Sequence, residues 1–137
     1  MDFLPRHFPN VGVVEAQLPE DVVENIWKVI NEAREQPEDM KPELAGNISS
    51  SIRLDASSPL LEKFVSEVLP SFMDSHIQNY GSPWRAVIKE GQGFNLESLW
   101  VNFQKKHEFN PPHDHSGVYS FVIWMQIPTS SAEQKKL

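Results

Sequence analysis

Residues 111–128 read PPHDHSGVYSFVIWMQIP, and they join two closely spaced histidines to the most apolar run of the chain. In an extended backbone successive side chains point to opposite faces, so His113 and His115 share one face while Asp114 points away from it. Neutral imidazole is a common metal ligand, and two imidazoles on one face can bind one ion. We therefore predict a metal site at the start of a strand over residues 118–127. In a proline-rich loop, however, such histidines are more commonly exposed without a ligand, and the pattern by itself favours that simpler interpretation.

The length and composition of the chain limit its class. A chain of 137 residues suits a single domain, which we place over residues 1–137, and it can bury a core without disulfides. It contains no cysteine, which excludes disulfide scaffolds, thiolate metal sites and cysteine nucleophiles. Its 19 acidic and 12 basic side chains give a formal net charge of −7, which repels a phosphate backbone. Nucleic acid is therefore not expected as a partner.

The sequence shows no membrane-spanning or targeting signal. Its longest apolar run is far shorter than the ~20 residues that span a bilayer, and its N-terminus lacks a basic segment followed by an apolar one. We accordingly expect a cytoplasmic protein without a membrane partner.

Two helices are expected in the N-terminal part of the chain. Apolar residues recur at three- and four-residue spacing over residues 19–36, which begin with a proline suited to the first helical turn. A second apolar stripe over residues 58–81 begins at a Ser-Pro cap and ends at a glycine. Pro70 lies inside this second stripe, which predicts a kink or a break near residue 69.

The rest of the chain is expected to be loop and strand. Residues 37–58 are rich in Pro, Ser, Asn and Asp, which predicts a long loop with a short strand at residues 52–54. Residues 84–90, 96–104 and 118–127 are rich in β-branched and aromatic side chains, which predicts three strands. The predicted fold class is therefore α+β, with two N-terminal helices packed on an antiparallel sheet. The aromatic side chains predicted to lie in the core are Trp27, Phe64, Phe72 and Trp124.

The motif region resembles a known enzyme family. Leu99-Trp-Val-Asn, followed by HEFNPPHDHSGVY over residues 107–119, is similar to the central segment of 2-oxoglutarate and iron(II)-dependent oxygenases. The variant it resembles is the prolyl-hydroxylase-like one found among phage and marine microbial sequences. In that family a Trp-x-Asn strand precedes a Pro-x-His-x-His segment, and a strand of Gly-Val-Tyr type follows. The Leu-Ala-Gly-Asn element at residues 44–47 and the preceding helices are also similar, so the resemblance covers most of the chain.

The resemblance implies a fold, a cofactor and a reaction class. The implied fold is a double-stranded β-helix, or jelly roll, with the helices on the outside of one sheet. Members of the family hold Fe(II) with a His-x-Asp/Glu pair and a distal His, and the open positions take the cosubstrate 2-oxoglutarate and oxygen. An Arg or Lys on a late strand pairs with the far carboxylate of the cosubstrate. The implied activity is that of a hydroxylase-type dioxygenase, for which the sequence does not identify the substrate.

Carried onto this sequence, the resemblance assigns five residues. His113 is the proximal ligand, and His115 stands where the family has a carboxylate. Either His115 is a second nitrogen ligand or Asp114 supplies the carboxylate, and we favour His115 on the two-residue period of a strand. Asn102 and Tyr119 are expected near the cosubstrate, although for Asn102 a structural hydrogen bond to a neighbouring backbone group is favoured over that role.

The resemblance is incomplete at its C-terminal side. No His or Arg follows Pro128, so the distal ligand and the cosubstrate arginine have no counterpart in these 137 residues. We expect the sequence to be the N-terminal part of a longer protein and to be inactive by itself. The predicted strand over residues 118–127 would then have an open edge, which predicts a homodimer through that edge.

Two other classes of function fit parts of the sequence. A cupin-like metal-binding barrel also begins its site with His-x-His, but no Glu follows His115 at four or five residues. A non-catalytic assembly module, in which the strands serve for association, would need no metal. Uptake of Fe(II) and consumption of 2-oxoglutarate separate these classes from the oxygenase.

Overall fold

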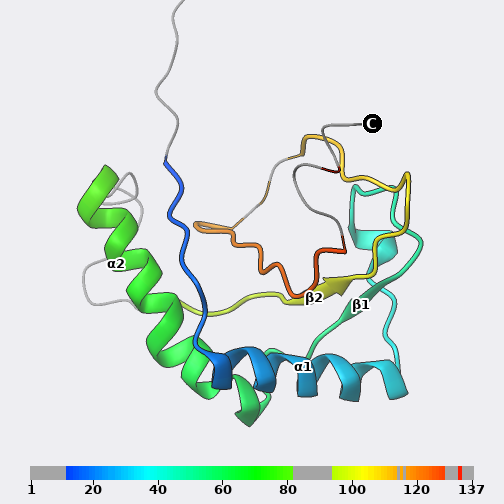
Figure 1. The fold of residues 1–137 in the computed structure, drawn as a ribbon, viewed down its shortest axis with the longest axis horizontal. Coiled ribbons are helices and arrows are strands. Elements are labelled where there is room, and N and C mark those ends of the chain that lie inside the picture. The colour runs from blue at the N-terminus through cyan, green and yellow to red at the C-terminus, as the bar shows by residue number, and fades with distance from the viewer. Residues whose placement is uncertain (1–11, 82–93, 114, 116, 129–132, 134–137) are drawn as a thin grey trace, which may run out of the picture.

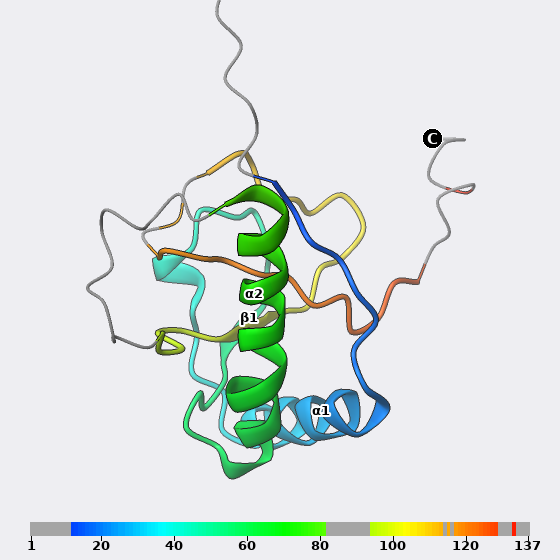
Figure 2. The ribbon, with the colours of Figure 1, turned by 90° about the vertical axis from the view of Figure 1, so that its left-hand side faces the viewer.

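A computed structural model describes residues 12–81, 94–113, 115, 117–128 and 133. Figure 1 shows helix α1 (Glu20–Glu35) along the base, helix α2 (Leu69–Tyr80) rising at one side, and strands β1 (Ser51–Arg53) and β2 (Trp100–Asn102) above α1. Figure 2 shows that α2 stands upright over α1. The predicted α+β class is confirmed at this level, as two helices with a two-stranded antiparallel sheet.

Helix α1 confirms the helix predicted over residues 19–36. Its backbone begins one residue later than predicted, because the Pro19 carbonyl accepts the N–H groups of Val22 and Val23, both at 3.1 Å, and Pro19 therefore stands outside the helix. The acidic residues of its first turn stabilise the helix, because they lie at the positive end of its dipole. Its buried face, made of Val22, Ile26, Val29 and Ile30, forms half of the hydrophobic core.

The second predicted helix is present and is not broken by Pro70. Helical backbone runs from Pro59 to Tyr80 through a 3₁₀ turn (Pro59–Leu61), a π-helical segment (Phe64–Val68) and α2. Pro70 has no N–H to donate, and just before it the Leu69 N–H reaches back five residues to the Phe64 carbonyl. The π-helical segment shifts the hydrogen-bond register at the position where the sequence predicts a kink or a break.

The sheet is short and is centred on β1. It pairs antiparallel with β2, with Ile52 opposite Val101, and β2 lies inside the strand predicted over residues 96–104. On its other edge β1 meets the preceding loop, because the Met40 N–H donates to the Ser51 carbonyl at 3.0 Å and the Arg53 N–H donates to the Glu38 carbonyl at 2.9 Å. The strand predicted at residues 52–54 is therefore present, shifted by one residue. The strand predicted over residues 84–90 lies outside the described residues.

Residues 118–127 form neither helix nor strand, so the strand predicted there is wrong for the described chain. Their burial still alternates as in an extended segment, because Ile123 and Met125 pack on the core while Val122 and Trp124 are 70% and 71% exposed. The placement of Trp124 in the core is wrong as well. The segment is held in place by side-chain packing and not by the hydrogen bonds of a sheet, since no described strand pairs with its backbone.

The hydrophobic core lies between α1, the 59–68 turns and the sheet. Phe64 is buried as predicted, while Trp27 and Phe72 are partly buried at its edge. In the part of the chain described here, no helix is long and apolar enough to cross a membrane. The two-stranded sheet does not establish a jelly roll, which stays a prediction. The buried core residues are Val22, Ile26, Val29, Ile30, Leu54, Leu61, Phe64 and Val68.

Candidate functional site

The structure brings the two motif histidines together. The ring centroids of His113 and His115 lie 4.7 Å apart with an interplanar angle of 61°, and both residues are exposed. Two imidazoles on one ion, with metal–nitrogen distances of about 2.0–2.1 Å and a tetrahedral or octahedral angle between them, place their centroids about 4.5–5 Å apart. The separation therefore fits two ligands of one divalent ion. The two rings therefore lie next to one another, and a metal site between them stays a prediction.

One hydrogen bond selects the tautomer of His113. Its Nδ1 lies 2.8 Å from the Pro111 carbonyl oxygen. Because a carbonyl oxygen can only accept, Nδ1 carries the proton and donates, and in the neutral ring the lone pair is then on Nε2. A backbone carbonyl commonly orients metal-binding histidines in this way. His113 is thus prepared to bind a cation through Nε2.

The described residues do not complete a metal site. No group of three or more His, Cys, Asp or Glu side chains gathers in the described parts of the chain in a way that could hold an ion. Asp114, the other candidate for the second ligand, lies outside the described residues. The residues present therefore fit two positions of the implied iron site and leave its third protein ligand without a described donor.

The segment that leads to the histidines is anchored to the 44–49 loop. The Asn47 N–H donates to the Phe109 carbonyl at 2.8 Å, and these two residues form an isolated antiparallel bridge. The side-chain oxygen of Asn110 occupies the space where a Cβ on Gly46 would lie, so a larger residue at position 46 would displace this exposed side chain. The Leu-Ala-Gly-Asn element thus sets the position from which the motif starts.

Glu108 is a residue of this anchor that the sequence did not reveal. Its Oε2 accepts the Lys105 N–H at 2.9 Å, and its Oε1 accepts the Ser49 N–H at 3.2 Å. It closes the turn that contains His107, whose φ of +70° is left-handed. Its more distant partner lies 59 positions away in the sequence, so no local pattern predicts the contact.

Acid is expected to weaken this anchor. The N–H of Lys105, followed by Ser49, holds the pKa of the Glu108 carboxyl below its ordinary value of 4.5. A carboxyl with a lowered folded-state pKa stabilises the fold above its unfolded pKa, and this contribution is lost as the pH falls through the folded value. We expect Glu108→Gln to lower Tm slightly at neutral pH and to flatten the loss of Tm below pH 4.5. Thermal unfolding at a series of pH values measures both effects. A Glu108→Gln variant that loses Tm below pH 4.5 as steeply as the parent chain would contradict the assignment.

Asn102 and Tyr119 contact other parts of the fold. The Asn102 Oδ1 accepts the Ser51 hydroxyl at 2.7 Å across the sheet, in register with it. The Tyr119 ring makes edge contacts with the buried His76 on α2 and with Phe94, each at 5.5 Å between centroids. Within the described chain, no hydrogen bond or ring contact joins either residue to the histidine pair. The interpretation of Asn102 as a sheet residue is therefore the one with an observed partner.

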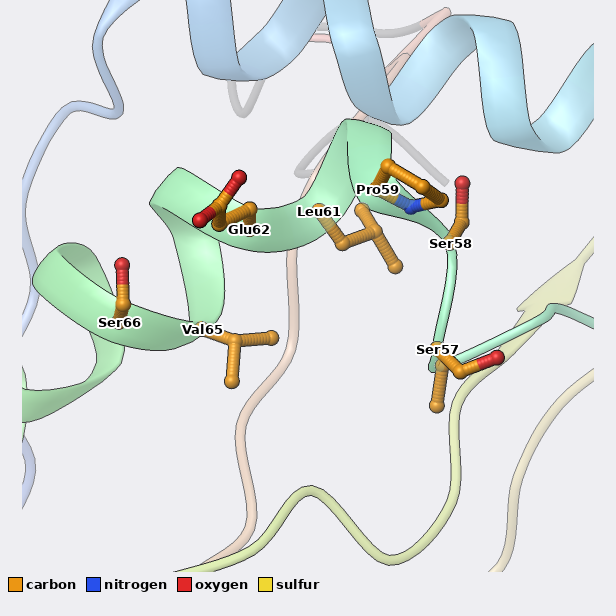
Figure 3. A pocket seen from close by; sticks show the side chains of 8 residues that line it. Ser57, Ser58, Pro59, Leu61, Glu62, Val65 and Ser66 are labelled. Atoms are coloured by element: carbon orange, nitrogen blue, oxygen red, sulfur yellow. The ribbon is translucent and has the colours of Figure 1, made fainter.

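Two hollows in the described part of the structure lie elsewhere. One, of about 360 Å³, is bounded by the start of the second helix; in Figure 3 Leu61 and Val65 project to one side of the turn and Glu62 and Ser66 to the other. A second, of about 610 Å³, lies between α1 and the sheet beside Arg53. The Arg53 guanidinium is already paired with Glu38 at 2.7 Å and Glu43 at 2.8 Å. Neither hollow is lined by the motif histidines, so neither extends the metal site.

Comparison with known proteins identifies no relative. No family model, no curated protein and no solved structure matches the chain.

Proposed function

We propose that this chain carries the metal-binding segment of a 2-oxoglutarate and iron(II)-dependent dioxygenase with a jelly-roll fold. The observation that supports the proposal is the histidine pair, with centroids 4.7 Å apart and with the Nδ1 proton of His113 held by a backbone carbonyl. Ferrous iron bound with 2-oxoglutarate and oxygen supplies the oxidation of an unactivated C–H bond. The substrate of that oxidation is not assigned.

Each named residue has a limited task in this proposal. His113 presents Nε2 to the ion, and His115 or Asp114 supplies the second ligand. Asn102 keeps its carbonyl oxygen on Ser51, which leaves its NH₂ group to donate to a cosubstrate carboxylate. Tyr119, held between α2 and Phe94, orients the chain that follows the motif. A third protein ligand is still required, because two imidazoles alone bind a divalent ion weakly.

Anaerobic titration with Fe(II) tests the proposal directly. We expect weak 1:1 binding by calorimetry, because the two imidazoles lack a third protein ligand. The double variant His113→Ala, His115→Ala should bind at least about tenfold more weakly still, because each imidazole supplies a direct bond to the ion. His107→Asn is the matched control, since this exposed histidine has a left-handed φ that asparagine tolerates. The single variants His115→Ala and Asp114→Asn decide which residue is the second ligand.

Addition of 2-oxoglutarate to the iron-loaded chain separates the oxygenase from a simple metal-binding module. The oxygenase proposal expects tighter Fe(II) binding in the presence of 2-oxoglutarate, because the cosubstrate completes the coordination of the ion. Equal Fe(II) affinity of the parent chain and the double variant would remove the metal site. Fe(II) binding without any effect of 2-oxoglutarate would favour the cupin-like alternative.

A further inference from the structure

The strongest feature outside the proposed site is an apolar strip on residues 118–127. In Figure 1 this segment is the orange trace that runs between α2 and β2. Side chains from both sides of the segment contribute, and the side that faces away from the core contributes most. We call this set the 118–127 strip; its exposed members are Val118 (36%), Phe121 (40%), Val122 (70%), Trp124 (71%) and Ile127 (57%).

The backbone of the 118–127 strip has N–H and C=O groups that can pair with another strand. Its one hydrogen bond among the described backbone pairs joins the Met125 N–H to the Ile123 carbonyl, which leaves the rest of the segment without a described ladder. The core-facing side chains already hold the segment in place, since the Phe121 ring meets the Phe64 ring edge-on at 5.5 Å and Ile123 packs on the core. A segment with an apolar outer face and no described sheet partner is a template for a strand of another chain.

The charge pattern favours a second copy of this chain as the partner. The chain carries a formal net charge of −7, yet residues 117–128 contain no charged side chain. Two copies can therefore bring their strips together without any like-charge pair within the contact, although their other surfaces repel. Antiparallel pairing of a segment with itself also creates a closed two-fold contact, which ends at the dimer.

The area of the strip agrees with a modest dimer. An aromatic side chain such as Trp124 buries about 150–250 Å² when it is covered, and the whole strip approaches the roughly 400 Å² of a large patch on a monomer. Two such strips together cover about 800 Å², which is the size of weak and transient contacts. We therefore expect a weak and reversible association.

We propose that the 118–127 strip is a dimerisation surface, covered by antiparallel pairing with the same strip of a second copy. This inference goes beyond the proposed metal site, because dimerisation and metal binding can each be demonstrated or rejected without the other. It also accounts for the exposure of Val122 and Trp124, which would be covered by the second copy.

Sedimentation velocity across the micromolar range tests the surface with one matched pair of variants. Val122→Glu places a charge in the strip, whereas Val13→Glu adds the same charge at a valine that is equally exposed, 74% against 70%. We expect the parent chain and Val13→Glu to dimerise alike. Val122→Glu should associate about 100-fold more weakly or remain monomeric, because two like charges would meet in the contact. Far-UV circular dichroism confirms that both variants are folded.

Single-cysteine variants give a second measurement that does not depend on Val122→Glu being folded. The chain has no cysteine, so Ser120→Cys, Val122→Cys and Trp124→Cys each introduce one reactive thiol on the outer side of the strip. Antiparallel partners lie about 4.5–5.5 Å apart between Cα atoms, within the range of a disulfide. Oxidation should therefore cross-link the position nearest the two-fold axis much faster than the other two, and Val13→Cys should remain uncross-linked.

The outcomes that overturn the proposal are distinct. A parent chain that stays monomeric at the highest concentration rejects it, as does equal dissociation of the dimer by Val13→Glu. Association that continues beyond the dimer would identify the strip as an aggregation-prone segment instead. Uniform cross-linking of all the cysteine positions would indicate random collisions and would also reject the paired arrangement.

Discussion

Leu61→Ala is expected to lower the free energy of unfolding by about 2–5 kcal/mol. Leu61 is 1% exposed and belongs to the 3₁₀ turn (Pro59–Leu61) that packs against α1. The substitution removes buried apolar surface and leaves a cavity that this close-packed junction can fill only in part. A domain has about 5–15 kcal/mol of stability in total, so the loss should be visible as a large shift of the denaturation midpoint. Urea unfolding followed by far-UV circular dichroism measures it.

Leu60→Ala is the matched control for this prediction. Leu60 is the preceding residue of the same turn and has the same chemistry, but it is only partly buried at the edge of the core. We expect a loss of about 1 kcal/mol, which is typical of a site with solvent on one side. Equal losses at the two positions would show that the turn does not present Leu61 to α1 as described.

Phe64→Ala is expected to cost about 3–5 kcal/mol, because it empties the centre of the core. Phe64 is 3% exposed and lies in the π-helical segment (Phe64–Val68). Its ring also meets Phe121 edge-on at 5.5 Å and an interplanar angle of 71°. The substitution should therefore also loosen residues 118–125, which we expect to become more sensitive to limited proteolysis than in the parent chain.

A double-mutant cycle with Phe121→Ala isolates the contact between these two rings. Edge-to-face aromatic pairs contribute about 0.5–1.5 kcal/mol beyond the area that they bury, so the two losses should differ from additivity by that amount. The unfolding experiments belong at low protein concentration, where self-association does not add to stability. A coupling energy of zero would mean that the 118–127 segment does not fold against the core.

The helices could be predicted from sequence because their signals are local. The apolar spacing over residues 19–36 and the Ser-Pro cap and terminal Gly81 of the second helix depend on neighbours within a few residues. Pro70 likewise indicated the right position for a disturbance, since the missing N–H is a property of the residue itself. The disturbance is a π-helical segment and not a break, because the Leu69 N–H donates to the Phe64 carbonyl. Core packing holds the helix on both sides of this segment.

The strand prediction for residues 118–127 failed because it depended on information that is not local. The residue types there favour an extended backbone, and the alternating burial of Ile123 and Trp124 agrees with that preference. A strand also needs a neighbour for its hydrogen bonds, and the position of that neighbour is not a local property. The same limit explains Trp124, whose apolar side chain could not show from sequence which face of the segment the core would cover.

Local sequence signals were enough to predict the positions of the helices, the alternating burial of residues 122–125 and the closeness of His113 and His115. These follow from steric preferences and from periodicity along the chain. Only the folded chain showed that Glu108 joins Ser49 and that Val122 and Trp124 face outward. Such facts depend on which distant segments meet, and the free energy of those contacts is a property of the whole fold.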